Sequence, residues 1–277
     1  MVRRAYHGPV VGLILVAALL AGCTVLRPAE TVRLRVLQLN LCNSGMALGC
    51  YTGRAVDQAA EVIRAERPEV VTLNEICSGD VDTLERAMRQ VPDDVVVAAF
   101  QPARNGRTGE PYRCVDGQRY GIGVLVRLAA PDRGHAVHHG FYPAQDPADP
   151  EQRAWLCVEA GTDLLACTTH LAYTSATLAL AQCTHLLGTA VPQLHADSGH
   201  RPTVVSGDLN LRQGGSPDVR SCVPAGYGHR HDGGVQQLMA TAELKIDATR
   251  SVDMDRTTDH AAFLVTLTTV RQPPPAA

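Results

Sequence analysis

Five short segments of the sequence place polar side chains directly after an apolar, strand-like run. They are residues 37–41, 70–76, 167–171, 204–210 and 258–260. The polar members are asparagines, carboxylates and histidines. Carboxylate and amide oxygens are hard ligands that suit Mg²⁺, Mn²⁺ or Ca²⁺, and histidines transfer protons near neutral pH. If the fold brings these strand ends together, they form a metal-assisted site for proton-transfer chemistry.

Each segment alone also has a purely structural explanation. Glu75 could cap a helix, His170 could end a strand, and Asp208 with Asn210 could form a turn, because Asp and Asn favour turns. Gly207 removes a side chain where the backbone is expected to turn sharply into the site. The order of all five segments along the chain is what favours a shared site.

That order is an early Asn, a Glu after the next strand, then Thr-His-Leu, Gly-Asp-x-Asn and a late Asp-His. It resembles the endonuclease/exonuclease/phosphatase (deoxyribonuclease I-like) family, which includes pancreatic deoxyribonuclease, apurinic endonucleases, sphingomyelinases and inositol phosphatases. The resemblance spans residues 32–267. It implies a four-layered α/β sandwich, with two mixed β-sheets packed face to face and helices outside. It also implies hydrolysis of a phosphoester with a divalent metal, Mg²⁺ first and Mn²⁺ or Ca²⁺ as alternatives.

The resemblance assigns a role to each matching position. The residues similar to the metal ligands are Asn40, Glu75 and Asp259. The residues similar to the catalytic groups are His170 and His260 as the two histidines, Asp208 beside the attacking water, and Asn210 on a phosphate oxygen.

One further family position, an aspartate that orients the last histidine, has two candidates here. Lys245-Ile246-Asp247 looks like the family segment, but Asp247 is too close to Asp259 to leave room for a strand, a turn and another strand. Asp232 precedes a strand and has the better register. We therefore predict that Asp232 supports His260 and that Asp247 does not.

The elements that must position these residues alternate along the chain. Apolar runs and period-two patterns predict strands, and apolar residues at helical spacing predict helices. The predicted strands are 32–41, 70–73, 95–100, 121–127, 155–160, 164–169, 203–206, 235–240, 248–252 and 262–267. The predicted helices are 54–66, 81–90 and 177–195. This alternation by itself favours two layered sheets flanked by helices.

Two long polar loops, residues 101–118 and 140–152, are candidates for facing a substrate. The first carries several arginines and is followed by Arg119 and Tyr120, just before the predicted strand from Gly121. Arginine binds phosphate through two parallel hydrogen bonds, so Arg119 and Tyr120 are candidate substrate contacts. A loop that is merely solvated would have the same composition.

The N-terminus has the pattern of an export signal. Arg3 and Arg4 precede a short apolar run, and Leu20-Ala21-Gly22-Cys23 looks like a bacterial lipobox. We predict a lipoprotein signal peptide at 1–22, lipidation of Cys23, a tether at 23–30, the catalytic domain at 31–270 and a disordered tail at 271–277. The protein is then lipid-anchored on the outer face of a bacterial membrane; a plain secretory signal is the alternative.

Cysteine usage agrees with export, because eight of the nine cysteines remain after Cys23 and exported cysteines usually pair. Cys157 and Cys167 flank a turn and would face each other in a hairpin, and Cys42 with Cys50 could close a short loop. By elimination, the other two pairs are Cys77 with Cys114 and Cys183 with Cys222. A zinc site is disfavoured, since the sequence has no C-x-x-C pair.

The formal net charge of −3 weighs against a dedicated DNA-binding protein, but not against an enzyme that carries its own cation. Three readings of the substrate stay open: a secreted nuclease, a sphingomyelinase-like phospholipid phosphodiesterase, and a non-catalytic surface lipoprotein on the same scaffold. The sequence lacks the G-x-S-x-G pattern of a serine hydrolase. We expect a monomer.

Overall fold

Two six-stranded mixed β-sheets lie face to face at the centre of the molecule. They are seen in a computed structural model that describes residues 1, 30–47, 53–89, 95–128, 134–161 and 163–271. The strands of the first sheet are β1 (Glu30–Asn40), β2 (Val70–Cys77), β3 (Val96–Pro102), β5 (Tyr120–Arg127), β13 (Leu244–Val252) and β14 (Ala262–Arg271). Their order across the sheet is β13-β14-β1-β2-β5-β3, and β1 and β2 run parallel.

The second sheet has the same kind of centre, a parallel pair flanked by antiparallel strands. Its strands are β6 (His135–Phe141), β8 (Ala154–Ala160), β9 (Leu164–Thr169), β10 (Thr203–Asp208), β11 (Gly228–His231) and β12 (Gln236–Ala240). The order is β11-β12-β10-β9-β8-β6, with β9 and β10 parallel. A separate two-stranded ribbon joins β4 (Arg104–Asn105) and β7 (Glu151–Gln152).

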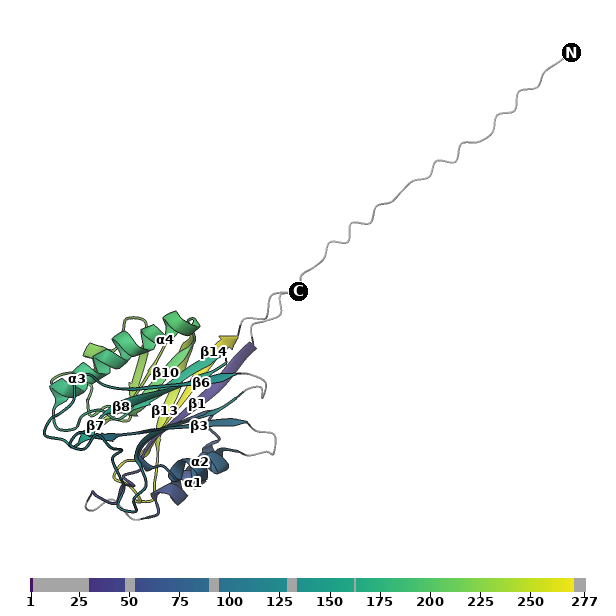
Figure 1. Cartoon of the computed structure of the whole chain (residues 1–277). Coiled ribbons are helices and arrows are strands. Elements are labelled where there is room, and N and C mark those ends of the chain that lie inside the picture. The colour runs from purple at the N-terminus through teal and green to yellow at the C-terminus, as the bar shows by residue number, and fades with distance from the viewer. Residues whose placement is uncertain (2–29, 48–52, 90–94, 129–133, 162, 272–277) are drawn as a thin grey trace.

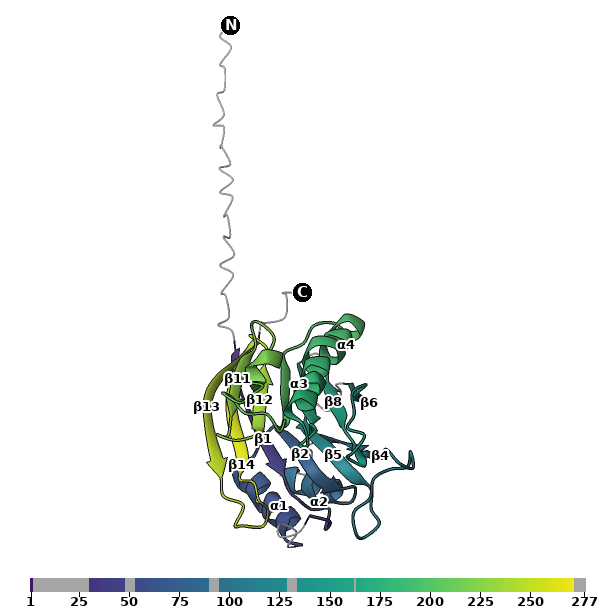
Figure 2. The ribbon, with the colours of Figure 1, turned by 90° about the vertical axis from the view of Figure 1, so that its left-hand side faces the viewer.

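Helices cover the two outer faces, as Figures 1 and 2 show. On the first sheet lie α1 (Ala55–Glu66) and α2 (Asp80–Met88). On the second lies a continuous helical rod of α3 (Ala176–His185), a π-helical turn (Leu186–Ala190) and α4 (Val191–Ser198). A 3₁₀ turn, Val219–Cys222, follows β10. The four layers confirm the predicted α/β sandwich.

Side-chain alternation along the strands builds three apolar layers. In β1, Leu37 and Leu39 point to the helices α1 and α2, whereas Val36 points between the sheets. In β10, Val204 faces the first sheet and Val205 faces the helical rod. The central strands β2, β9 and β10 and the second half of β1 are therefore buried on both faces.

The strands that the sequence did not predict are polar edge elements. The strand β6 has the sequence HAVHHGF and β11 has GHRH, and both contain histidines where a buried strand would have aliphatic residues. The predicted single helix 177–195 contains the π-helical turn. Pro192, near the start of α4, has no N–H to donate to the preceding helical turn.

Three of the predicted disulfide bonds are confirmed: Cys77–Cys114, Cys157–Cys167 and Cys183–Cys222. Cys157 and Cys167 are directly opposite in the β8–β9 hairpin, as their spacing predicted. Cys50, Cys23, the predicted signal peptide beyond Met1 and the tail beyond Arg271 lie outside the described residues. Within the described part of the chain, no helix is both long and apolar enough to cross a membrane.

Candidate active site

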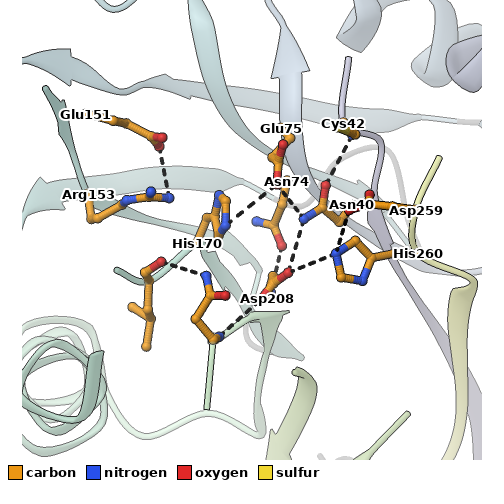
Figure 3. A network of polar contacts seen from close by, with 12 residues as sticks. Asn40, Cys42, Asn74, Glu75, Glu151, Arg153, His170, Asp208, Asp259 and His260 are labelled. Carbon is orange, nitrogen blue, oxygen red and sulfur yellow. Dashed lines mark hydrogen bonds and ion pairs between the residues drawn. The ribbon is translucent and has the colours of Figure 1, made fainter. Parts of the chain in front are cut away.

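The two parallel strand pairs end at the same edge of the sandwich, and the predicted site residues gather there (Figure 3). In the first sheet, Asn40 at the end of β1 is in register with Asn74 of β2. In the second, His170, just past β9, forms a parallel bridge with Asp208, the last residue of β10. The carboxyl ends of parallel strands are where layered folds expose polar groups to a ligand.

Glu75 is turned into the site by a break in its own strand. The pairing of β2 with β5 shifts register between Leu73 and Ile76, so two residues bulge out of the ladder. Glu75 itself adopts a left-handed backbone conformation with φ of 55°, which costs energy for a residue with a Cβ. Bulges re-aim side chains next to active sites. Here the bulge brings Glu75 Oε1 to 2.8 Å from Asn40 Nδ2, which donates to it.

Asp208 is the most closely held carboxylate of the site. Its Oδ2 accepts from Asn40 Nδ2 at 3.1 Å and its Oδ1 accepts from the backbone N–H of Asn210 at 3.0 Å. Its own N–H donates to Asn74 Oδ1 at 2.7 Å. Burial raises the pKa of Asp208, whereas His260 and the two hydrogen bonds oppose that rise. The side chain is thus fixed in position and has above-normal proton affinity.

Gly207 is needed for a close backbone approach rather than for a turn. Its φ lies outside the left-handed region, but a Cβ at this position would lie 2.1 Å from the carbonyl oxygen of Thr169. That distance is far below any non-bonded contact. The expected reason, a sharp turn, is therefore wrong, and the correct one is the tight packing of β10 against β9.

His170 is buried beside Glu75, with 3.8 Å between its Nε2 and Glu75 Oε1. Burial, together with the positive charges of Arg153 and His260, lowers its pKa well below the usual value. Its ring is therefore neutral at neutral pH. The Nδ1 atom is buried and has no hydrogen-bond partner among the described residues.

His260 lies between two carboxylates on the opposite side of Asp208. Its Nε2 is 3.6 Å from Asp208 Oδ2 and 3.7 Å from Asp259 Oδ2. The hydroxyl of Thr258 donates to the backbone oxygen of Asn40 at 2.8 Å, which ties the loop after β13 to the end of β1. The predicted Asp-His pair is thereby joined to the other motifs.

The two aspartates considered for supporting His260 lie in different environments. Asp232 accepts hydrogen bonds from the N–H of Gly234 at 2.6 Å and from Gln236 Nε2 at 3.1 Å, and it is close enough to raise the pKa of Asp208. Asp247 is on the outer face of β13, where it pairs with Lys245 and Thr268. The structure brings Asp232 toward the site and keeps Asp247 away; the orienting role of Asp232 stays a prediction.

The remaining predicted contacts are placed as follows. Asn210 has φ of 49°, and its Nδ2 donates to the backbone oxygen of Leu171 at 2.9 Å, so it links the ends of β9 and β10. Arg119 is exposed, with its guanidinium 5.7 Å from the centroid of the Phe100 ring. Tyr120 is only 5% exposed, so of this predicted pair it is Arg119 that a substrate can reach.

Sequence reasoning missed a buried charged group beside His170. The guanidinium of Arg153 is 3% exposed and lies 3.1 Å from Asp149 Oδ2 and 3.1 Å from Glu151 Oε1. Figure 3 shows it pointing from the start of β8 toward His170. Its Nε has no hydrogen-bond partner in the described part of the chain. An Arg that follows Asp149 and Glu151 closely and comes just before a predicted strand was the one available signal.

The site has donors that suit a hard divalent cation. Burial raises the pKa of Glu75, and the nearby charges of Asp208 and Asp259 raise it further; a cation would relieve that repulsion. Among the described residues, one group of three Cys, His or acidic side chains has its ligand atoms within 4.8 Å of one another. The group is Cys77, Cys114 and Asp116, and its two cysteines form a disulfide. The carboxylates and amides at the strand ends therefore suit a hard divalent cation that binds one or two carboxylates and keeps several waters.

A scan against models of protein families found no match, and a search of curated proteins found no relative. Solved structures do match. An endonuclease/exonuclease/phosphatase family protein from Bacteroides thetaiotaomicron has a TM-score of 0.61 and 12% identity, covering 90% of this chain and 99% of that one. One from Beutenbergia cavernae has a TM-score of 0.59 and 20% identity, covering 88% and 73%.

The catalytic domain of human Nocturnin, solved with a bound sulfate anion, gives a TM-score of 0.63 at 14% identity over 88% of this chain and 99% of that one. Identities this low carry information on architecture alone. The chain therefore has the fold of the endonuclease/exonuclease/phosphatase proteins, the family that its five motifs resemble.

Proposed function

We propose that this protein is a divalent-metal-dependent phosphodiesterase of the endonuclease/exonuclease/phosphatase family. One observation carries the proposal. The Asp208 carboxylate is oriented by Asn40 and Asn210 and lies 3.6 Å from the His260 imidazole, while Glu75 contacts the same Asn40 amide from the other sheet. Two carboxylates bridged by the Asn40 amide, with His170 beside Glu75 and His260 beside Asp208, match the requirements of hydrolysis at phosphorus.

In the proposed reaction a water attacks phosphorus in line with the ester oxygen that leaves. Asp208 accepts the proton of the attacking water, for which its position and raised pKa suit it. The P–O ester bond breaks, the leaving oxygen takes a proton from solvent water to become an alcohol, and Asp208 returns its proton to solvent. His260 lies where a ring N–H can stabilise the charge that builds on the phosphoryl oxygens, and neutral His170 donates an N–H to one of them.

Glu75 would hold the divalent cation, with Asn40 and Asp259 beside it. When bound, the cation supplies electrostatic stabilisation of the phosphoryl oxygens. Asn40 then has a second role, since its Nδ2 already links Glu75 and Asp208 through hydrogen bonds.

A phosphate as the reacting group has two supports besides the acid–base pair. The Arg153 guanidinium points toward His170 (Figure 3), and guanidinium groups bind tetrahedral oxyanions well. The Nocturnin catalytic domain, which has this fold, was solved with sulfate bound, and sulfate has the shape and charge of a phosphate.

We also propose that the enzyme acts outside the cytoplasm, anchored through Cys23 or secreted. The lipobox-like segment before Cys23 and the three disulfide bonds support this location, because disulfides persist mainly in oxidising compartments. Metabolic labelling with a radioactive fatty acid tests the anchor. Label in the intact chain and none in Cys23→Ser is the expected result.

The test of the activity is a panel assay on the chain from Thr24 onward. Plasmid DNA, RNA, sphingomyelin, phosphatidylcholine and a chromogenic phosphodiester are offered with Mg²⁺ and with EDTA. We expect turnover of at least one phosphodiester in Mg²⁺ only, reduced about 10³-fold or more in Asp208→Asn. The matched control is Asp57→Asn, on the exposed face of α1. Turnover that survives EDTA or Asp208→Asn contradicts the proposal, and no turnover at all favours a binding protein.

A further inference from the structure

An aromatic side chain projects into solvent at the rim of the active site. Tyr173 follows His170 by three residues and is 67% exposed. Its neighbours on both sides are anchored: the N–H of Ala172 donates to Gln182 Oε1 at 2.9 Å, and the hydroxyl of Thr174 bonds to Asp146. The backbone that carries the exposed ring is thus fixed, although the ring itself has little packing.

The guanidinium of Arg153 lies against this ring, with 5.6 Å between Arg153 Cζ and the Tyr173 centroid. Arg153 is itself 3% exposed and is oriented by Asp149 and Glu151. It therefore joins two groups: its charged end points toward His170, where the reacting phosphate is proposed to lie (Figure 3), and its guanidinium carbon lies over the Tyr173 ring. A ligand whose phosphate contacts Arg153 would have its next group beside the Tyr173 ring.

We infer that Tyr173 is a stacking platform for the nucleobase of a nucleotide unit whose phosphate is bound by Arg153 and His170. This inference rests on the proposed function and names its substrate class. Every nucleobase presents a flat π face, and base–aromatic stacking tolerates any sequence. A quaternary ammonium headgroup fits less well, because an aromatic cage for a cation does not normally include a guanidinium.

Two diesters that differ in one group test the inference. One is the para-nitrophenyl ester of thymidine monophosphate, and the other is methyl para-nitrophenyl phosphate; both release the same phenolate. We expect the unmodified protein to have a kcat/KM about tenfold or more higher for the nucleoside diester. Tyr173→Ala should lose this preference, Tyr173→Phe should keep it, and Val137→Ala, an exposed apolar control on the edge strand β6, should change nothing.

The outcomes separate the two proposals. If both diesters are cleaved equally well and Tyr173→Ala changes neither rate, the nucleobase platform is wrong while the phosphodiesterase stands. If Tyr173→Ala lowers both rates by the same factor, the ring acts on the shared part of the substrate, and the inference is also overturned. A preference for para-nitrophenyl phosphorylcholine that Tyr173→Ala abolishes assigns the platform to a headgroup instead. No turnover of any diester defeats the proposed function itself.

Discussion

The side-chain oxygen of Asn74 accepts the backbone N–H of Asp208 across the interface between the two sheets, with 2.7 Å between the atoms. The same Asn74 oxygen accepts from Gln38 Nε2 at 2.7 Å, and Gln38 Oε1 accepts from the hydroxyl of Thr72. Asn74 Nδ2 donates to the carbonyl of Thr169 at 3.1 Å. This fully buried network of hydrogen bonds fixes the position of Asp208, at the end of β10, relative to β2.

Removing the Asn74 amide should weaken both the fold and the catalysis. Asn74→Ala leaves the N–H of Asp208 and the amide of Gln38 without their acceptor inside the core, which costs about 3 kcal/mol in unfolding free energy. Misplacement of Asp208 should lower kcat by about tenfold or more at temperatures well below unfolding. Denaturant unfolding and steady-state kinetics measure the two effects. Full kcat in Asn74→Ala would show that Asp208 is positioned by its other bonds.

Divalent metal should stabilise the folded protein through Glu75. Because a ligand that binds only the native state raises the unfolding free energy, millimolar Mg²⁺ or Mn²⁺ should raise Tm and EDTA should reverse it. Glu75→Gln should abolish the shift together with activity, whereas Glu61→Gln on the exposed face of α1 should keep both. A metal-dependent rise in Tm that persists in Glu75→Gln would place the ion elsewhere.

The Arg153 guanidinium should be important for stability as well as for substrate. Arg153→Ala removes the partner of Asp149 and Glu151, and uncompensated buried carboxylates cost about 3–5 kcal/mol. Arg86→Ala, at an exposed position of α2, is the matched control and should have little effect. Chemical denaturation of the three proteins decides the point. Equal stability of Arg153→Ala and the control would mean that the two acids are solvated or protonated without it.

Glu151 should make stability depend on pH in the range near neutrality. Burial raises the pKa of Glu151 from 4.5 to about 7, against the lowering effect of Arg153. The folded protein therefore binds a proton that the unfolded chain has released, so this contribution to stability is complete below pH 4.5 and is lost as pH rises through about 7. A shift of this size corresponds to roughly 3 kcal/mol at most.

The measurement is the unfolding free energy of Glu151→Gln and of the unmodified protein at several pH values from about 5 to 8. The substitution should flatten the decrease that the unmodified protein shows over this interval, because glutamine does not titrate. Glu61→Gln again serves as the exposed control and should leave the decrease intact. Parallel curves for Glu151→Gln and the unmodified protein would assign the pH dependence to other groups.

Local pattern was sufficient for much of the fold and for the main candidate site. Apolar runs such as that of β10 predict buried strands because burial on both faces requires an unbroken apolar sequence. Asp208 and His170 were identified because each directly follows such a run, and the pairing of Cys157 with Cys167 followed from their symmetric spacing about a turn. These features depend on neighbours in sequence, so the sequence alone determined them.

Other features depended on how distant segments pack together. In the sequence, Asn74 is simply a polar residue at a strand end. Its hydrogen bond with the N–H of Asp208 exists because the second sheet packs against the first. The strained bulge that aims Glu75 depends on pairing with β5, and the position of Arg153 beside His170 depends on the β8–β9 hairpin. Contacts between the two sheets leave no periodic pattern in the sequence, because each contacting residue follows only the apolar and polar alternation of its own strand. The sequence by itself therefore determined which residues stand at the strand ends, and the tertiary packing decided which of them touch.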